Sequence, residues 1–161
     1  MLTQEQIWQA LEAVVDPEIP VVSVCELGIV REVHVNQDTA TVVITPTYSG
    51  CPATEAIEAA IRETLSQAGA SQVHVERRLA PAWTTDWITP AAAAKLREYG
   101  IAPPGQAKSE AQVVRFTVPA PACPRCGSTR TQRLSQFGST ACKALYRCNE
   151  CAEPFDYFKP I

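Results

Sequence analysis

Four of the seven cysteines in this 161-residue chain form two CxxC pairs. The pairs are Cys123-Pro-Arg-Cys126 and Cys148-Asn-Glu-Cys151, and 21 residues lie between them. Two residues between thiolates allow a tight turn that directs both sulfurs to one ion, and Gly127 permits such a turn. Four thiolates complete a tetrahedral shell and leave no open position for a substrate. The spacing therefore predicts a structural zinc site, with a rubredoxin-type iron site as the alternative, because both metals suit four sulfur ligands.

The part of the chain that carries this site is too small to fold on apolar burial alone. A unit of about 40 residues buries little apolar surface, so the metal is expected to supply the folding free energy. We predict a zinc ribbon over residues 112–161, in which residues 112–118 form a leading strand. Cys142 lies close in sequence, and we expect it to be a reduced fifth thiol near the site, because the CxxC pairs already provide four ligands.

The charged residues divide the chain into two parts of opposite balance. Residues 1–110 contain seven Lys and Arg against fourteen Asp and Glu, whereas residues 111–161 contain seven against three. Such a split predicts two units with different surfaces, and residues 101–111, which carry proline and glycine, are the expected linker. The positive excess in the second part is too small to indicate a nucleic-acid partner.

Cysteine usage and hydropathy indicate the compartment. The odd cysteine count and the CxxC pairs favour reduced thiols over a disulfide framework, so we expect a cytoplasmic protein. No apolar run approaches the roughly 18 residues of a membrane span, and the first residues do not resemble a secretory signal. We therefore expect no membrane partner.

Hydrophobic periodicity predicts a first domain over residues 1–100. Thr3 and Gln6 form a capping-box signature in front of a helical apolar stripe. The other expected elements are strands at 29–35 and 40–45, a helix at 52–68, a strand at 72–79 and a helix at 90–99. The expected fold class is α+β, with a small helix-packed sheet domain followed by a C-terminal zinc ribbon.

Cys51 stands between Gly50 and Pro52, where the helix at 52–68 is expected to begin. Proline is well tolerated at the first helical position, so the pattern predicts Cys51 as the N-cap residue. Serine or aspartate would cap better, because a thiol is a weak acceptor for free amides. The position instead favours a thiolate, since the helix dipole stabilises negative charge there. The alternative is a small buried hydrophobe at a tight turn, and we expect Cys25 to be a core residue of that kind.

Other candidate side chains fit ordinary structural roles. His34 and His74 each lie between valines in expected strands, which predicts solvated or hydrogen-bonded surface positions. Asp16 and Glu18 belong to an Asp-Pro-Glu sequence, which is common turn chemistry. The chain has no glycine-rich phosphate loop and no nucleophile elbow. Nothing in the sequence assembles a self-sufficient active site.

Several segments resemble a known protein family. The segments DPEIPVVS from Asp16, LGIV from Leu27 and TPTYSGCP from Thr45 are similar to the small α+β domain family associated with iron–sulfur assembly. SufT and the cytosolic cluster-targeting factors belong to that family. The ribbon segments FGSTACKA, LYRC and PFDYFK are similar to one branch of it, the accessory subunits of bacterial phenylacetyl-CoA epoxidase systems. The resemblance covers nearly the whole chain.

The resemblance implies roles for particular residues. The functional cysteine of the family matches Cys51, and the acids of its Asp-Pro-Glu sequence match Asp16 and Glu18. Many relatives have Asp-Leu-Gly where this chain has Glu26-Leu-Gly, so the carboxylate is kept in type but lengthened at Glu26.

The resemblance also implies a function. The chain would be a non-catalytic accessory or maturation subunit of the multicomponent monooxygenase that epoxidises the ring of phenylacetyl-CoA, with the oxygenase and reductase subunits as partners. Cys51 would help to hold a transient iron–sulfur cluster, whose other thiolates would come from a homodimer or a client interface. The reductase is the expected client. In agreement with this role, the chain lacks the paired Glu and Glu-x-x-His helices of a di-iron bundle.

Three alternatives differ from this function in class. A docking module would use the ribbon to bind partner subunits and would handle no cluster. An enzyme would use Cys51 as a nucleophile or redox thiol, although no base accompanies it in the sequence. A nucleic-acid-binding ribbon is disfavoured by the acidic first part of the chain.

Overall fold

The structure is a computed structural model that describes residues 1–105 and 119–161. The strand predicted over residues 112–118 and the last part of the predicted linker lie outside the described residues. The chain divides into two compact units, Met1–Ala92 and Ala93–Ile161. The predicted α+β class is confirmed, because helices accompany two mixed sheets. None of the helices in the described ranges is long and apolar enough to cross a membrane.

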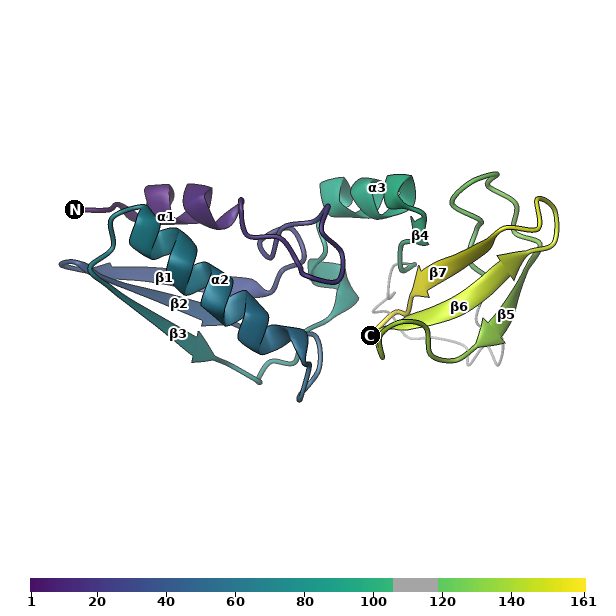
Figure 1. Ribbon diagram of the computed structural model, residues 1–161. Coiled ribbons are helices and arrows are strands. Elements are labelled where there is room, and N and C mark those ends of the chain that lie inside the picture. The colour runs from purple at the N-terminus through teal and green to yellow at the C-terminus, as the bar shows by residue number, and fades with distance from the viewer. Residues whose placement is uncertain (106–118) are drawn as a thin grey trace. The chain divides into compact units, whose positions relative to one another are not determined.

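The first unit is a three-stranded sheet with two helices on one face (Figure 1). Its elements are α1 (Gln4–Leu11), β1 (Val30–Asn36), β2 (Thr39–Ile44), α2 (Ala53–Gln67), β3 (Gln72–Arg77) and the short 3-10 helix η1 (Thr85–Trp87). β1 and β2 form an antiparallel hairpin, and the α2 crossover makes β2 and β3 parallel. The predicted capping box at the start of α1 is present, with 3.2 Å from the Gln6 amide to Thr3 Oγ1.

Apolar side chains from both helices and from one face of the sheet form the core of the first unit. Ile7 and Leu11 of α1, Val42 of β2, and Ile61 and Leu65 of α2 are completely buried. The stripes at i, i+4 therefore place each helix on the sheet, as the periodicity predicts. Both histidines of the chain are exposed on their strands, as expected from the same alternation.

Leu27 and Gly28 hold the segment after β3 against the first unit. The indole N–H of the buried Trp83 donates to the Leu27 carbonyl oxygen at 2.9 Å. Gly28 has a φ of +72°, and a Cβ there would lie 2.6 Å from Trp87 Cβ and 2.8 Å from the Trp87 carbonyl oxygen. The position requires glycine for its left-handed backbone and also for the close approach of Trp87. The Leu-Gly pair of the family-like segment LGIV therefore has a packing role.

The second unit contains a four-stranded sheet of order β4-β7-β6-β5. It includes most of α3 (Pro90–Tyr99), followed by β4 (Ile101–Ala102), β5 (Thr131–Ser135), β6 (Lys143–Cys148) and β7 (Pro154–Phe158). β5, β6 and β7 are antiparallel neighbours, and β4 adds to β7 in parallel. β4 falls at the start of the segment expected to be a linker, so this segment contributes to the ribbon sheet. The domain limits given by the sequence stay a prediction.

The buried core of the ribbon is small and includes metal-ligand cysteines. Its members are Ala102, Cys123, Cys148, Phe155 and Tyr157, with Tyr146 packed against them. The Tyr146 ring lies 5.9 Å from the Phe155 ring and 5.4 Å from the Tyr157 ring, measured between centroids. Such a cluster buries too little apolar area to stabilise a fold without a further cross-link.

We predict that Gly28→Ala destabilises the first unit more than Gly69→Ala does. Gly69 also has a positive φ, of +108°, but no atom lies within 4 Å of its added Cβ. Gly69→Ala should therefore cost about 1–2 kcal/mol for backbone strain alone, and Gly28→Ala should cost about 2 kcal/mol more because Trp87 must move. Urea unfolding followed by tryptophan fluorescence measures this, since all three tryptophans lie in the first unit. Equal losses for the two variants would contradict the close contact.

Candidate metal centre and the thiols of the first unit

The four cysteines of the CxxC pairs converge on one point in the second unit. Their sulfur atoms all lie within 4.8 Å of one another, with 3.8 Å between Cys123 and Cys151 and 3.5 Å between Cys126 and Cys148. Tetrahedral zinc with Zn–S bonds of about 2.3 Å separates its sulfurs by about 3.8 Å. The four side chains therefore fit a closed tetrahedral metal centre. Within residues 1–105 and 119–161, this is the one group of three or more His, Cys, Asp or Glu side chains close enough to share an ion.

The two CxxC turns are built in the same way. The Cys123 amide donates to the carbonyl oxygen five residues later, at Ser128, and the Cys148 amide donates to Glu153, each at 2.9 Å. The residue after each second cysteine has a left-handed backbone, with φ +75° at Gly127 and +62° at Ala152. Paired turns of this kind direct two sulfurs each toward a shared ion, as the CxxC spacing predicts.

Backbone amides stabilise the sulfurs as thiolates. The amides of Ser128 and Glu153 point at the sulfurs of Cys126 and Cys151, two residues before each. The amides of Cys151 and Glu150 lower the pKa of Cys148 to about 7, although burial acts in the opposite direction. Donors fixed in advance favour the deprotonated form that a metal requires.

Cys142 lies in the second unit but is not a member of the four-sulfur group. It is buried, and its sulfur lies 3.0 Å from the hydroxyl oxygen of Thr140. The loop before β6 holds it in place, because its carbonyl oxygen accepts from the Lys159 amide at 3.0 Å. Cys142 therefore has a packing position of its own.

Cys51 lies in the turn that leads into α2 and is half-buried. The prediction that it is the N-cap residue is wrong, because the N-cap is Pro52, and no side chain caps this helix. The difference of one residue arises because Pro52 already has helical backbone angles, with φ −65° and ψ −23°. The Cys51 backbone still joins the turn, since its carbonyl oxygen accepts from the Thr54 amide at 3.1 Å.

The carboxylates that the resemblance associates with Cys51 are part of the loop structure. Asp16 is buried, and its Oδ1 accepts from the amides of Glu18 and Ile19 at 2.8 and 3.0 Å, which closes the Asp-Pro-Glu turn. Glu26 Oε2 accepts from the Ser23 amide at 3.0 Å, and Ser23 Oγ accepts from the Glu26 amide at 3.0 Å. These reciprocal bonds make a capping box around a single helical turn.

Cys25 lies inside the Ser23–Glu26 turn and is half-buried rather than a full core residue. Burial, and then the nearby charges of Glu12 and Glu26, raise the pKa of its thiol to about 12. Cys25 is therefore a neutral thiol at neutral pH, which suits a structural position. The Ser-x-x-Glu spacing at residues 23–26 is the sequence signal by which this capping box could have been found.

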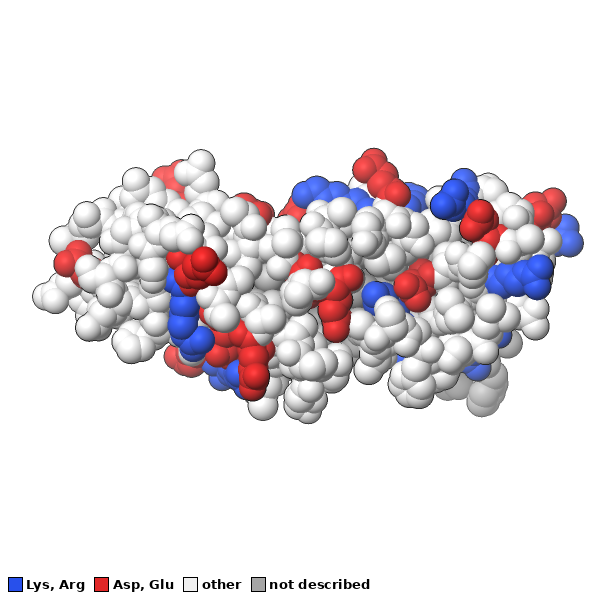
Figure 2. Space-filling model, viewed as in Figure 1, with Lys and Arg blue, Asp and Glu red and all other residues white. Residues whose placement is uncertain are grey.

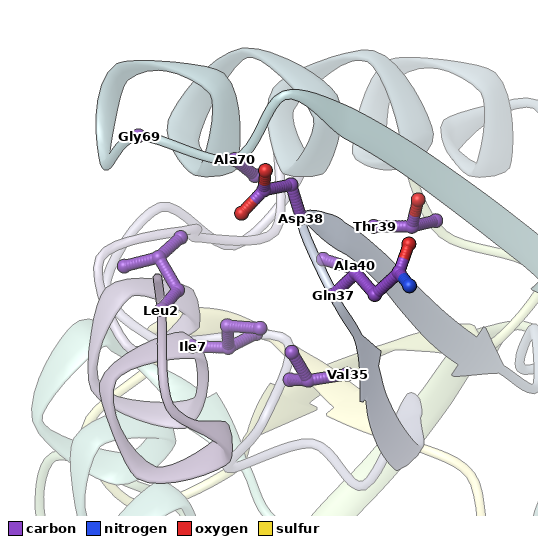
Figure 3. Close-up of a pocket in the computed structure, with 9 residues that line it drawn as sticks. All are labelled: Leu2, Ile7, Val35, Gln37, Asp38, Thr39, Ala40, Gly69 and Ala70. Atoms are coloured by element: carbon purple, nitrogen blue, oxygen red, sulfur yellow. The ribbon is translucent and has the colours of Figure 1, made fainter.

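A shallow hollow lies beside the β1–β2 hairpin turn (Figure 3). Its lining comes from the start of α1, the hairpin turn and the turn before β3, with Leu2, Ile7, Val35, Gln37, Asp38, Thr39, Ala40, Gly69 and Ala70. The Asp38 carbonyl oxygen accepts from the Ser71 and Gln72 amides at 3.2 and 3.3 Å, which joins the two turns. The hollow is lined mainly by small and apolar groups with one carboxylate, so it offers no constellation for chemistry.

Comparison with known proteins gives the class of each part of the chain. Residues 4–76 match the family described as iron-sulfur cluster assembly protein, and residues 107–159 match the PaaD zinc beta ribbon domain. A domain of unknown function from Bacillus anthracis has a TM-score of 0.55 and 27% identity, over 58% of this chain and 90% of its own. A conserved hypothetical protein from Thermotoga maritima has a TM-score of 0.51 and 28% identity, over 59% and 94%. The chain thus joins an iron–sulfur assembly domain to a zinc-ribbon domain.

The whole chain is similar to one epoxidase component. It is 52% identical over 156 residues to a protein of Escherichia coli (strain K12) named as a putative 1,2-phenylacetyl-CoA epoxidase component, over 97% of this chain and 92% of that protein. An Fe-S protein maturation auxiliary factor of Porphyromonas gingivalis is 36% identical over 54% of this chain and 84% of its own. The chain belongs to the PaaD family of phenylacetyl-CoA epoxidase components, which confirms the resemblance seen in the sequence.

We predict that Cys148→Ser removes the metal and unfolds the ribbon but leaves the first unit folded. Three thiolates and a hydroxyl bind zinc far more weakly, and the small ribbon core does not fold alone. Metal analysis should find one ion per chain in the wild type and none in the variant. Amide NMR dispersion of residues 119–161 should collapse, whereas tryptophan fluorescence from the first unit should stay unchanged. Cys142→Ser is the matched control and should keep its ion; retained metal and dispersion in Cys148→Ser would contradict the assignment.

Proposed function

We propose that the chain is a non-catalytic accessory subunit of the phenylacetyl-CoA epoxidase system that assists iron–sulfur cluster assembly or delivery to the reductase component. One observation carries this proposal. A single chain joins an iron–sulfur assembly domain to a PaaD ribbon, and it is 52% identical to a protein named as an epoxidase component. The relative named as an Fe-S protein maturation auxiliary factor supports the same role for the first domain.

In this proposal the two groups of thiols have different tasks. Cys123, Cys126, Cys148 and Cys151 hold a permanent zinc ion that stabilises the ribbon, because a closed four-sulfur site leaves no position for exchange. Cys51 is a ligand of the transient cluster, which is cargo and not a resident cofactor. Its half-buried position in a turn keeps a soft donor within reach of solvent.

The carboxylates shape the surroundings of that cargo. Asp16 and Glu26 accept backbone amides within their own turns, so we propose that they position loops and do not supply the main cluster ligands. Glu18 is exposed at the same turn as Asp16 and is accessible to a client. Clusters usually need four thiolates, and within the described residues Cys51 belongs to no group of three or more metal-ligating side chains. Further ligands must therefore come from a second copy or from the client.

A docking function without cluster handling is the second candidate. The observation that favours it is the closed four-sulfur centre, which gives the ribbon a rigid fold but no exchange chemistry. Metal and acid-labile sulfide analysis of protein purified without oxygen separates the two functions. Zinc alone would support docking, whereas zinc with iron and sulfide would support cluster handling.

We predict that Cys51→Ser keeps the fold but abolishes growth on phenylacetate. Serine at a half-buried turn should change stability by about 1 kcal/mol or less, whereas a hydroxyl does not replace a thiolate for iron–sulfur chemistry. The measurement is growth of cells that carry only the variant, together with its melting temperature. Cys25→Ser is the matched control, since Cys25 is the other half-buried thiol of the first unit. Full growth with Cys51→Ser would sink the cluster proposal.

A further inference from the structure

The turn between β5 and β6 presents a large aromatic side chain to solvent. Phe137 is 62% exposed, and Leu134 in the preceding strand is 52% exposed. In the sequence, Phe137 begins the family-like segment FGSTACKA, which neither the metal centre nor the cluster proposal uses. An exposed phenylalanine in a small metal-stabilised domain gives little stability to the core, so it needs another explanation.

Hydrogen bonds hold Phe137 in this outward position. Ser135 Oγ donates to the Phe137 carbonyl oxygen at 2.7 Å and accepts from the Phe137 amide at 3.3 Å. The Gly138 amide donates to the Lys143 carbonyl oxygen at 2.7 Å. A Cβ at Gly138 would lie 2.8 Å from Asp156 Oδ1, so glycine suits this close approach. The turn is therefore ordered before it meets any partner.

Two cations flank the aromatic ring. The Lys159 ammonium lies 4.4 Å from the Phe137 ring centroid and donates to the Gln136 carbonyl oxygen at 2.9 Å. Arg133 donates to Gln136 Oε1 at 2.8 Å. Neither cation takes part in an ion pair within the described residues. The charges of Arg133 and Lys159 are therefore accessible to an outside partner. We call Arg133–Gly138 together with Lys159 the Phe137 turn.

Two of the three acids of the ribbon are engaged away from this turn. Glu150 pairs with Arg130 at 2.8 Å, and Glu153 lies 3.9 Å from Arg125, both beside the CxxC turns. The third acid, Asp156, lies next to Gly138, so the Phe137 turn keeps an excess of positive charge.

The charge pattern of the ribbon argues against a nucleic acid. On the face in view, positive and negative side chains are interspersed, with no large field of one sign (Figure 2). A phosphate backbone needs a continuous positive track, which this face does not offer. The Phe137 turn is instead a local cationic site with an apolar centre, which suits an acidic protein surface with an apolar pocket.

We propose that the Phe137 turn is the anchor by which this chain docks on a partner protein, with Phe137 in an apolar pocket of an acidic surface. This inference rests on the proposed function and assigns the partner to another component of the epoxidase system. Ordered aromatic side chains serve as binding hot spots because little side-chain entropy is lost on docking. Arg133 and Lys159 steer association toward carboxylates and stabilise the encounter complex.

The test uses the full chain with its metal bound and the purified oxygenase and reductase components of the epoxidase. Calorimetry or surface binding should show that Phe137→Ala weakens association with one component at least 30-fold, which corresponds to a hot-spot residue. Lys159→Glu should weaken it about tenfold, and added salt should reduce binding of the wild type. The matched control is Tyr99→Ala, which removes a 51% exposed aromatic side chain from α3 and should bind as the wild type does.

The other outcomes each decide the inference. Unchanged binding by Phe137→Ala would overturn it and leave the proposed function intact. Loss of self-association in the variant, with no effect on the epoxidase components, would make the occupant a second copy and overturn the assignment. Binding of a single-stranded oligonucleotide that depends on Phe137 would also overturn it. Absence of any wild-type binding would overturn the inference, whereas the cluster proposal is tested separately by growth of Cys51→Ser.

Discussion

Convergence of four thiols is the constraint on which the second unit depends. The buried cluster of the ribbon contains five residues, and two of them, Cys123 and Cys148, are members of the four-sulfur group. A bound metal therefore cross-links the same side chains that the aromatic residues pack against. Both CxxC turns and the strands β5 to β7 follow from this centre. The Phe137 turn depends on it as well, because it connects two of those strands. In this chain the metal centre determines the structure on which any docking surface must be built.

The motif residues of the first unit separate into those that contacts explain and one that they do not. Asp16 closes a turn through two backbone amides, and Gly28 allows Trp87 to approach. Glu26 caps the single helical turn around Cys25. Cys51 differs, because within the described residues its side chain does not cap α2 and joins no metal-ligating group. Structural need therefore accounts for the loops, and chemistry is the remaining reason for a thiol at position 51.

Local signals allowed much of this fold to be predicted. The capping box at Thr3, the i, i+4 stripes of α2 and the CxxC spacing each depend on residues close in sequence, and each occurs in the structure. The sequence was less informative where distant segments decide the outcome. β4 is a two-residue strand that exists because β7 accepts it, and no periodicity marks so short an element. The orientation of Phe137 depends on Ser135 and on the approach of Asp156 to Gly138, which only the folded ribbon brings together.

The central claim is that the chain prepares the epoxidase and takes no part in its chemistry. The most direct measurement is turnover of phenylacetyl-CoA by purified oxygenase and reductase, with and without this chain. Components already loaded with their metal centres should turn over equally well in both cases, whereas a reductase prepared without its cluster should become active only when the chain and a source of iron and sulfide are added. A requirement for stoichiometric amounts of the chain with fully loaded components would contradict the account and would indicate a direct role in catalysis or electron transfer.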